Sequence, residues 1–249
     1  MDQINKIQVF QTPEKLTEAT AEFIVKTAKD AVSTRGRFAI SLSGGHTPER
    51  LYTLLSKPPF VSQMPWDKTF VFWGDERCVP SDDPQNNARM AKVLLLNHIT
   101  IPAANIYPIP VDMSPADAAN DYEKTINNFF KEEAPRFDLI LLGLGENGHT
   151  ASLFPGTEVV FEKSRLVKEV YVDEQKMFRI TMTAPLINQA YNIMFLMEGA
   201  GKAEILNTVL NTAYQPEKYP AQLIKPVNGN LYWYMDQKAA ALLPGQNKE

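Results

Sequence analysis

Sulfur chemistry is nearly absent from this sequence, which contains one cysteine, Cys78, among 249 residues. A single thiol excludes an intrachain disulfide and any zinc site built on several thiolates. The three histidines, His46, His98 and His149, do not follow a metal-ligand spacing either. The composition therefore offers no structural metal site.

Long hydrophobic runs and an excess of positive charge are also missing. No apolar run approaches the roughly 18 residues that span a bilayer. The formal net charge is −4, so the chain as a whole has no general attraction to nucleic acid or to anionic membranes. The first residues lack the basic and apolar regions of a secretory signal. We expect a protein of a reducing, cytoplasmic compartment with no nucleic-acid or membrane partner, and the oligomeric state stays open, a monomer included.

The sequence does contain a regular alternation of strand and helix patterns. Segment 13–33 repeats apolar residues at a helical period, and segment 37–43 follows as a strand. Further strands are predicted at 69–77, 137–143, 166–172, 177–182, 191–197 and 231–235, and further helices at 47–56, 85–97, 115–131 and 201–210. This alternation predicts one α/β domain over residues 1–249, with a mainly parallel central sheet and helices on both faces. Ligands gather at the carboxyl ends of the strands in such folds, so the residues just after each strand are the candidates for a site.

The segment 137–156, FDLILLGLGENGHTASLFPG, joins a predicted strand to a glycine-rich loop. Residues 143–148 match the spacing G-x-G-x-x-G, but a dinucleotide site needs an acidic residue about 20 positions later, and Asp173 lies further on. His149 directly follows the third glycine, where a dinucleotide loop gains nothing from a ring. We interpret the loop as one that presents His149, and we expect a helix N-terminus after it to keep the imidazole neutral and basic. A capping or packing role for His149 is the alternative.

Two more of the predicted strand ends carry groups that suit an anionic substrate. Residues 43–48, SGGHTP, combine glycines with the start of a helix, where backbone N–H groups and the helix dipole favour an anion. A plain turn with Thr47 as the helix cap is the alternative. Residues 73–77, WGDER, offer Asp75 as an acceptor for sugar hydroxyls and Arg77 as a partner for a phosphate or an oxyanion. An exposed charged turn explains the second segment equally well.

Arg179, in RITMT, and Lys202, in GAGKAEIL, are weak signals separately, since most cations are solvated. The two cations become stronger evidence in combination with other segments: SLSGGHTPERLY, FWGDERCVPSDDPQNNARM, the glycine-rich segment and the late LYWYMD. In this order the segments resemble the 6-phosphogluconolactonase family over about residues 10–242. The wider family also contains glucosamine-6-phosphate deaminase. The resemblance implies a fold similar to that deaminase and to ribose-5-phosphate isomerase.

The resemblance also implies an activity, the hydrolysis of 6-phospho-D-glucono-1,5-lactone to 6-phospho-D-gluconate in the oxidative pentose phosphate pathway, without metal or organic cofactor. It implies that His149 is the general base that activates water, acting with Arg77 and Asp75. The substrate phosphate would be bound by Ser43, Gly44, Gly45, His46, Thr47, Arg179 and Lys202. Gly145, Asn147 and Gly148 would form the loop beside the substrate.

Three residues depart from the patterns of these relatives. Asn147 stands where both enzymes usually have an aspartate, and Phe154 stands where the deaminase has a glutamate. An amide and a phenyl ring cannot transfer protons, which disfavours ring-opening deaminase chemistry. His46 replaces a small hydroxyl residue of the phosphate loop. Two further functions stay open at this point, a nicotinamide oxidoreductase and a non-catalytic sugar-phosphate sensor.

Overall fold

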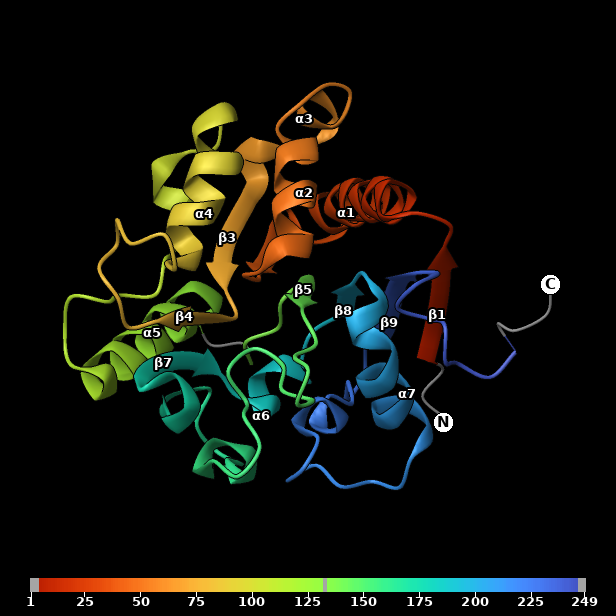
Figure 1. Ribbon diagram of the computed structural model, residues 1–249. Helices are drawn as coiled ribbons and strands as arrows, with labels where there is room; N and C mark the ends of the chain where they lie inside the picture. The colour runs from red at the N-terminus through yellow and green to blue at the C-terminus, as the bar shows by residue number, and fades with distance from the viewer. Residues whose placement is uncertain (1–4, 132–133, 246–249) are drawn as a thin grey trace.

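The centre of the molecule is a six-stranded sheet, seen in a computed structural model that describes residues 5–131 and 134–245 (Figure 1). The strand order is β1 (Asn5–Phe10), β9 (Asn230–Asp236), β8 (Asn192–Met197), β5 (Leu139–Leu142), β2 (Phe38–Leu42) and β3 (Thr69–Trp73). Every neighbouring pair is parallel, which confirms the predicted sheet. β2 and β5 are buried along their whole length, as their nearly unbroken apolar sequences require.

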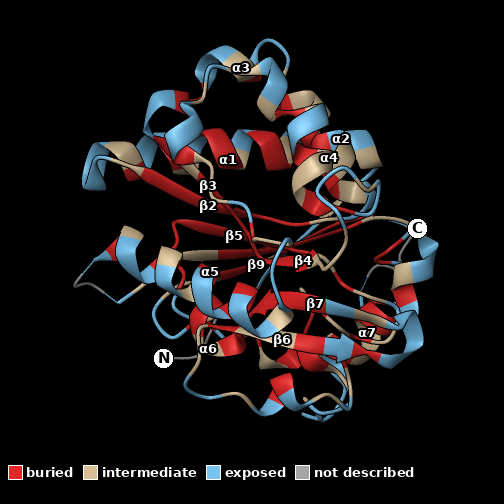
Figure 2. Ribbon diagram, turned by 90° about the vertical axis from the view of Figure 1, so that its left-hand side faces the viewer, coloured by how far each residue is buried: buried red, intermediate tan, exposed pale blue. Residues whose placement is uncertain are grey.

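Helices cover both faces of this sheet, as predicted (Figure 2). On one side lie α1 (Pro13–Arg35), α2 (His46–Leu55), α3 (Phe60–Gln63) and α4 (Asn87–Leu94). On the other side lie α5 (Pro115–Phe130), α6 (Ala184–Ile187) and α7 (Ala203–Asn211). Short 3-10 turns occur at Trp66–Lys68, Leu96–His98, Ala103–Asn105, Glu158–Phe161, Asp173–Gln175, Ala200–Lys202 and Pro220–Leu223.

The ends of α1 show how local sequence sets an element. The hydroxyl of Thr12 accepts a hydrogen bond from the N–H of Lys15 at 3.3 Å, and Pro13 occupies the first turn. Gly36 ends the helix with φ 73°, a conformation that glycine adopts without steric cost. These signals place the observed helix within two residues of the predicted segment 13–33.

A smaller antiparallel sheet, with the order β4 (Asp75–Arg77), β7 (Met177–Met182) and β6 (Val167–Val172), was not predicted. The single strand predicted at 69–77 is wrong, because Gly74 divides it between the two sheets. The N–H of Gly74 donates to the carbonyl of Leu42 in the central sheet at 3.0 Å, and its own carbonyl accepts from Met182 in the smaller sheet at 2.8 Å. One residue thus joins the sheets, and the charged residues after it leave the central sheet.

The remaining differences concern one whole strand, β1, and the length of one helix, α4. β1 was not predicted, and the helix predicted at 85–97 is shorter because a 3-10 turn follows α4. One hydrophobic core joins the sheets and helices of the described residues. Residues 1–4, 132–133 and 246–249 lie outside the described part, so the domain bounds 1–249 stay a prediction.

Candidate active site

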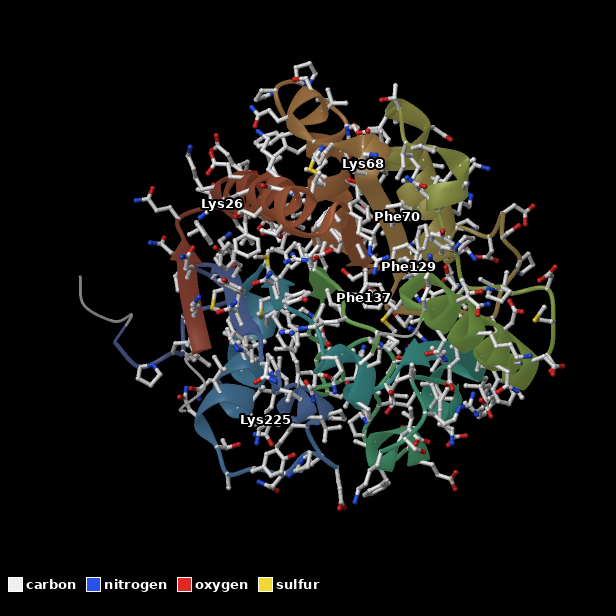
Figure 3. All side chains as sticks on the ribbon, turned by 180° about the vertical axis from the view of Figure 1, so that it is seen from behind. Lys26, Lys68, Phe70, Phe129, Phe137 and Lys225 are labelled. Atoms are coloured by element: carbon white, nitrogen blue, oxygen red, sulfur yellow. The ribbon has the colours of Figure 1, made fainter. Side chains whose placement is uncertain are left out.

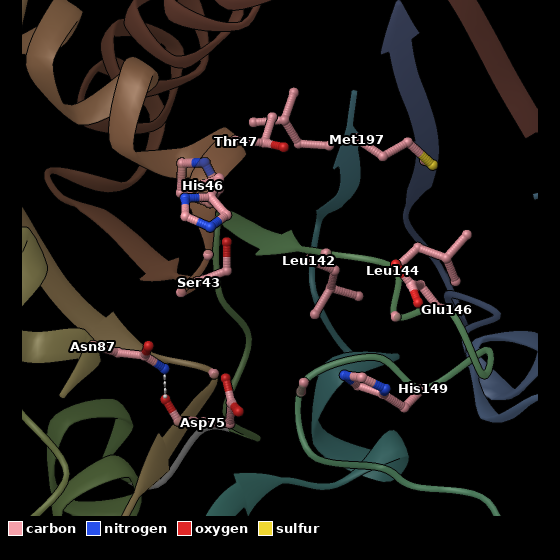
Figure 4. Close-up of a pocket in the computed structure, with 18 of the residues that line it drawn as sticks. Ser43, His46, Thr47, Asp75, Asn87, Leu142, Leu144, Glu146, His149 and Met197 are labelled. Atoms are coloured by element: carbon pink, nitrogen blue, oxygen red, sulfur yellow. Dashed lines mark hydrogen bonds between the residues drawn. The ribbon is translucent and has the colours of Figure 1, made fainter. Parts of the chain in front are cut away.

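A cavity of about 810 Å³ opens at the carboxyl edge of the central sheet (Figure 4). Its walls are the segments that follow β2, β3, β5 and β8, with contributions from α2 and β7. Most of the predicted site residues line it: Ser43, Gly44, Gly45, His46, Thr47, Asp75, Arg77, Gly145, Asn147, His149, Arg179 and Lys202. Gly148 is the exception, since its backbone packs against Tyr219. Residues distant in the sequence therefore meet around one cavity.

The loop after β5 holds His149 in a tight turn. The N–H of Gly148 donates to the carbonyl of Gly145 at 3.0 Å, and the N–H of Gly145 donates to the carbonyl of His149 at 2.9 Å. Gly148 has φ 80°, which favours glycine. A Cβ on Gly145 would lie 2.0 Å from the His149 ring, so this position must lack a side chain. The glycines therefore shape the turn around the imidazole, and no α-helix follows them as a dinucleotide loop requires.

Asn147 orients the His149 ring. Its Oδ1 accepts a hydrogen bond from the backbone N–H of His149 at 3.2 Å and lies 2.6 Å from the ring Nδ1. An amide oxygen can only accept, so Nδ1 carries the proton and donates to it. The second ring nitrogen, Nε2, is left with a free lone pair.

The surroundings of His149 keep the ring neutral. Burial lowers the pKa of His149 to about 4; the carboxylate of Asp75 opposes this shift, whereas three nearby cations reinforce it: Arg179, Lys202 and Arg77. The ring of Phe154 stacks on the imidazole with centroids 4.1 Å apart, which excludes water from one face. A neutral imidazole was predicted, but the predicted cause is wrong. No helix begins directly after Gly148, so desolvation and neighbouring charge take the place of a helix dipole.

Asp75 and Arg179 form a buried ion pair in the wall of the cavity. Oδ2 of Asp75 lies 3.4 Å from Nη1 of Arg179 and accepts from the hydroxyl of Ser152 at 2.6 Å. Arg179 also donates to Oε1 of Gln175, from Nε at 3.1 Å and from Nη2. Sequence reasoning missed Ser152 and Gln175, because neither directly follows a strand of the central sheet.

Arg77 is held by the segment that leads into α4. Its Nη1 donates to the carbonyl of Gln85 at 2.7 Å and to Oδ1 of Asn87 at 2.8 Å. The buried carboxylate of Glu76 accepts from the backbone N–H groups of Arg77, Asn87 and Ala88, each at 2.8 Å. Burial raises the pKa of Glu76 to about 7, against the effect of these donors. Glu76 thus connects β4 to the start of α4 and fixes the backbone position from which the Arg77 side chain extends.

The loop between β2 and α2 presents backbone donors. A Cβ on Gly44 would lie 2.0 Å from Oδ1 of Asn87, and Gly45 has φ 103°, so both positions favour glycine. Gly45 is the N-cap and α2 begins at His46, so the interpretation of Thr47 as the cap is wrong. The first N–H groups of a helix have no partner within it, which leaves donors for an anion. The hydroxyl of Ser43 is buried and has no hydrogen-bond partner among the described residues.

The side chain of His46 takes no part in this arrangement. It is 96% exposed, and its Nδ1 lies 3.6 Å from the carboxylate of Glu49 on the same helix. The imidazole that replaces a small hydroxyl residue therefore points into solvent. This is expected for a loop that binds an anion through its backbone N–H groups.

Lys202 and Glu198 line the cavity from the segment after β8. Lys202 ends the turn Ala200–Lys202 and is half-buried. Oε1 of Glu198 lies 3.6 Å from Nε of Arg50, whereas its Oε2 is buried without a partner among the described residues. Burial raises the pKa of Glu198. Sequence reasoning missed Glu198, although it directly follows an apolar strand and its position was therefore a detectable signal.

Within residues 5–131 and 134–245, no group of three or more His, Cys, Asp or Glu side chains could hold a metal ion. The helices of that same part of the chain are all too short or too polar to cross a membrane.

Comparison with known proteins gives consistent matches over almost the whole chain. The family described as glucosamine-6-phosphate isomerases/6-phosphogluconolactonase matches residues 11–233. A 6-phosphogluconolactonase of Synechocystis sp. is 41% identical over 238 residues, which cover 94% of this chain and 96% of that protein. The structure of the 6-phosphogluconolactonase from Trypanosoma brucei superposes with a TM-score of 0.87 at 28% identity, covering 97% of this chain and 100% of that one. A monomeric glucosamine-6-phosphate deaminase, 22% identical with a TM-score of 0.82 over 95% of this chain and 99% of its own, shares the fold.

Proposed function

The chain belongs to the family of glucosamine-6-phosphate isomerases and 6-phosphogluconolactonases, and on this premise we propose that it hydrolyses 6-phospho-D-glucono-1,5-lactone to 6-phospho-D-gluconate with His149 as general base. The contact of 2.6 Å between Asn147 and Nδ1 of His149 carries the proposal, because it leaves Nε2 free to accept a proton. His149 lines a cavity that also contains the cations a phosphorylated lactone needs.

The reaction consists of two proton transfers around one tetrahedral intermediate. Nε2 of His149 takes a proton from water as the water oxygen bonds to the lactone carbonyl carbon. Arg77 stabilises the negative charge that develops on the carbonyl oxygen. The bond to the ring oxygen then breaks, and the imidazolium returns its proton to that oxygen. The product is an open-chain acid that ionises at neutral pH.

The substrate phosphate binds between the loop 43–47 and Lys202. The support is the start of α2 and the hydroxyl of Ser43, whose donors have no partner in the described part of the chain, together with the positive charge of Lys202 in the same cavity. Arg179 contributes charge, but its guanidinium is already paired with Asp75 and Gln175. Asp75 therefore acts by holding Arg179, and it is not the base.

Substrate binding strengthens the base. A pKa of about 4 describes a weak base, and the cations around the cavity contribute to this low value. A bound phosphate adds negative charge beside those cations and so raises the pKa of His149. The imidazole then titrates closer to the working pH, where a general base is most effective.

Ring-opening deaminase chemistry has less support. The Asn147 side chain binds the His149 ring as an acceptor, and Phe154 stacks on that ring without a group that could transfer a proton. The proposed reaction uses no metal and no organic cofactor. We also infer a cytoplasmic location, supported by the free thiol of Cys78, which is typical of proteins in reducing compartments.

Lactone hydrolysis followed by acid release, corrected for spontaneous hydrolysis, tests the activity. The purified chain should accelerate decay of the phosphorylated lactone and act poorly on unphosphorylated glucono-lactone, because the phosphate is the main source of affinity. Equal kcat/KM for the two lactones would mean that the phosphate site is misassigned. A rate equal to the uncatalysed one, with 6-phosphogluconate still bound, would instead identify a sensor.

A further inference from the structure

A second cavity, of about 630 Å³, lies at the opposite edge of the sheet, where β2, β5 and β8 begin. Four cations line it: Arg35, Arg37, Lys131 and Arg136. Asp138 is the one carboxylate among the described lining residues. The described lining is therefore positive, although the whole chain carries −4. Figure 3 views the molecule from behind and labels Phe129 and Phe137, two of the aromatic residues packed beside this cavity.

Asp138 is already satisfied within the fold. Its Oδ2 accepts from the N–H of Ala39 at 2.7 Å, and its Oδ1 accepts from Nε and Nη2 of Arg35 at 2.8 and 2.6 Å. The carboxylate is nearly inaccessible to solvent, so this ion pair is a fixed and neutral unit. It leaves the charges of Arg37, Lys131 and Arg136 without compensation in the described lining.

Arg37 and Arg136 are held by aromatic rings. Within residues 5–131 and 134–245 neither forms an ion pair. The guanidinium carbon of Arg136 lies 3.7 Å from the ring centre of Tyr191, and its Nη2 donates to the carbonyl of Asn228 at 2.5 Å. The guanidinium of Arg37 lies 4.6 Å from the ring centre of Phe129, and its one hydrogen bond to a described residue, the Phe129 carbonyl, is 3.5 Å long. Stacking fixes these groups without using most of their N–H donors.

One buried donor makes this edge different from an ordinary solvated surface. Nε of Arg136 is shielded from solvent and has no hydrogen-bond partner among the described residues. An unpaired buried donor is costly, and one on a charged group is more so. The charge of an anion bound beside the guanidinium would offset this cost, and would also offset the repulsion between the neighbouring cations.

We propose that this cavity binds the phosphate group of a small phosphorylated molecule. Phosphate carries more negative charge than a carboxylate, and its oxygens match the forked donors of guanidinium groups. The cavity is separate from the one that contains His149, because it lies at the opposite end of the same strands. β2 alone, five residues long, places roughly 16 Å between the two edges.

Calorimetric titration of inorganic pyrophosphate into the full chain, with saturating 6-phosphogluconate in the catalytic cavity, tests the proposal. One pyrophosphate should bind per chain. The double variant Arg37→Gln/Arg136→Gln should weaken this binding about tenfold or more, because two charge-assisted contacts are removed. Its kcat/KM for the lactone should stay unchanged, which shows that the protein is folded. Parallel titrations with ATP and glucose-6-phosphate distinguish a nucleotide from a sugar phosphate as the source of the phosphate group.

The double variant Lys26→Gln/Lys225→Gln is the matched control, since it removes the same charge at two exposed positions away from the cavity (Figure 3). It should bind pyrophosphate within about twofold of the unmodified chain, the change expected from long-range charge alone. Equal losses in both double variants, or no binding in the presence of 6-phosphogluconate, would overturn the proposal. If Arg37→Gln/Arg136→Gln does not fold, Arg37→Gln alone gives the test, because that side chain makes one long hydrogen bond. Unchanged binding in Arg37→Gln would contradict the site.

Discussion

The two ends of β2, β5 and β8 carry polar cavities that are built differently. At the carboxyl end, Gly44 and Gly145 lack the Cβ atoms that would lie 2.0 Å from Asn87 and from His149. At the amino end no glycine lines the described cavity wall, and aromatic rings hold the guanidinium groups in place. Glycine turns allow a side chain or a substrate to approach the backbone closely, whereas aromatic stacking only orients the charged guanidinium groups.

The charged side chains at the two ends also have different surroundings. Around His149 the cations are coupled to acceptors, as Arg179 is to Asp75 and Arg77 is to Asn87. The arrangement therefore controls the basicity of one imidazole. At the amino end Arg35 likewise has a carboxylate partner, whereas Arg37 and Arg136 lie against aromatic rings. No imidazole lies in the described lining there, so the two ends fit the different functions proposed for them.

Adding one carbon atom at the carboxyl end should cause the greatest loss of activity. Gly145→Ala places a Cβ on the imidazole, so the ring must move away from Asn147. Loss of a positioned general base lowers kcat by roughly 10²–10⁴-fold. Steady-state lactone hydrolysis measures this loss. Gly143→Ala is the control, because no atom lies within 4 Å of its added Cβ, and it should keep most of the activity. Similar rates for the two variants would contradict the role of Gly145.

Removing one positive charge from either end of the strands should affect only the function proposed for that end. Lys202→Gln should weaken 6-phosphogluconate binding about tenfold or more and raise KM accordingly, since a charge-assisted hydrogen bond contributes about 1.5–3 kcal/mol. Arg136→Gln should leave the KM for the lactone unchanged. Calorimetry with 6-phosphogluconate and steady-state kinetics decide the matter. A rise of KM in Arg136→Gln as large as in Lys202→Gln would mean that the two cavities are not independent.

A milder change is expected from Asn147→Asp. A carboxylate accepts the same two hydrogen bonds and adds negative charge, so the pKa of His149 should rise. The acid limb of the kcat/KM profile should move to higher pH, while kcat at neutral pH changes less than about tenfold. Ammonia release from glucosamine-6-phosphate should remain undetectable, because Phe154 still supplies no carboxylate. Measurable ammonia release from this variant, or from the unmodified chain, would favour a deaminase.

Periodicity predicted most of the central sheet because its interior strands, such as β2 and β5, are buried and its main helices α1 and α5 are long. The segment 177–182 was predicted with its observed bounds as β7. β1 was missed since it is an edge strand with Ile7 exposed, so it lacks the apolar pattern of an interior strand. The break at Gly74 was missed because TFVFWGDER reads as one continuous strand. Only the hydrogen bonds of Gly74 to both sheets reveal the division.

The carboxyl-end site was predictable for a related reason. Its main residues follow strands, and parallel strands bring their ends together. The contacts that tune those residues, such as Ser152 to Asp75 and Phe154 to His149, depend on how loops fold back, which spacing does not encode. The cations of the amino-end cavity precede strands or end helices, so no motif marks them.

A nitrogen-15 NMR titration of the imidazoles tests directly whether His149 is a neutral base with its proton on Nδ1. The exposed His46 and His98 give reference signals in the same sample. We expect a pKa near 4 for His149, the Nδ1–H tautomer above that pH, and a higher pKa when 6-phosphogluconate is bound. Because the lowered pKa keeps the basic form down to acidic pH, kcat/KM should fall only as the pH drops toward 4. A pKa at or above the ordinary value of about 6.5, or a proton on Nε2, would refute this assignment of His149.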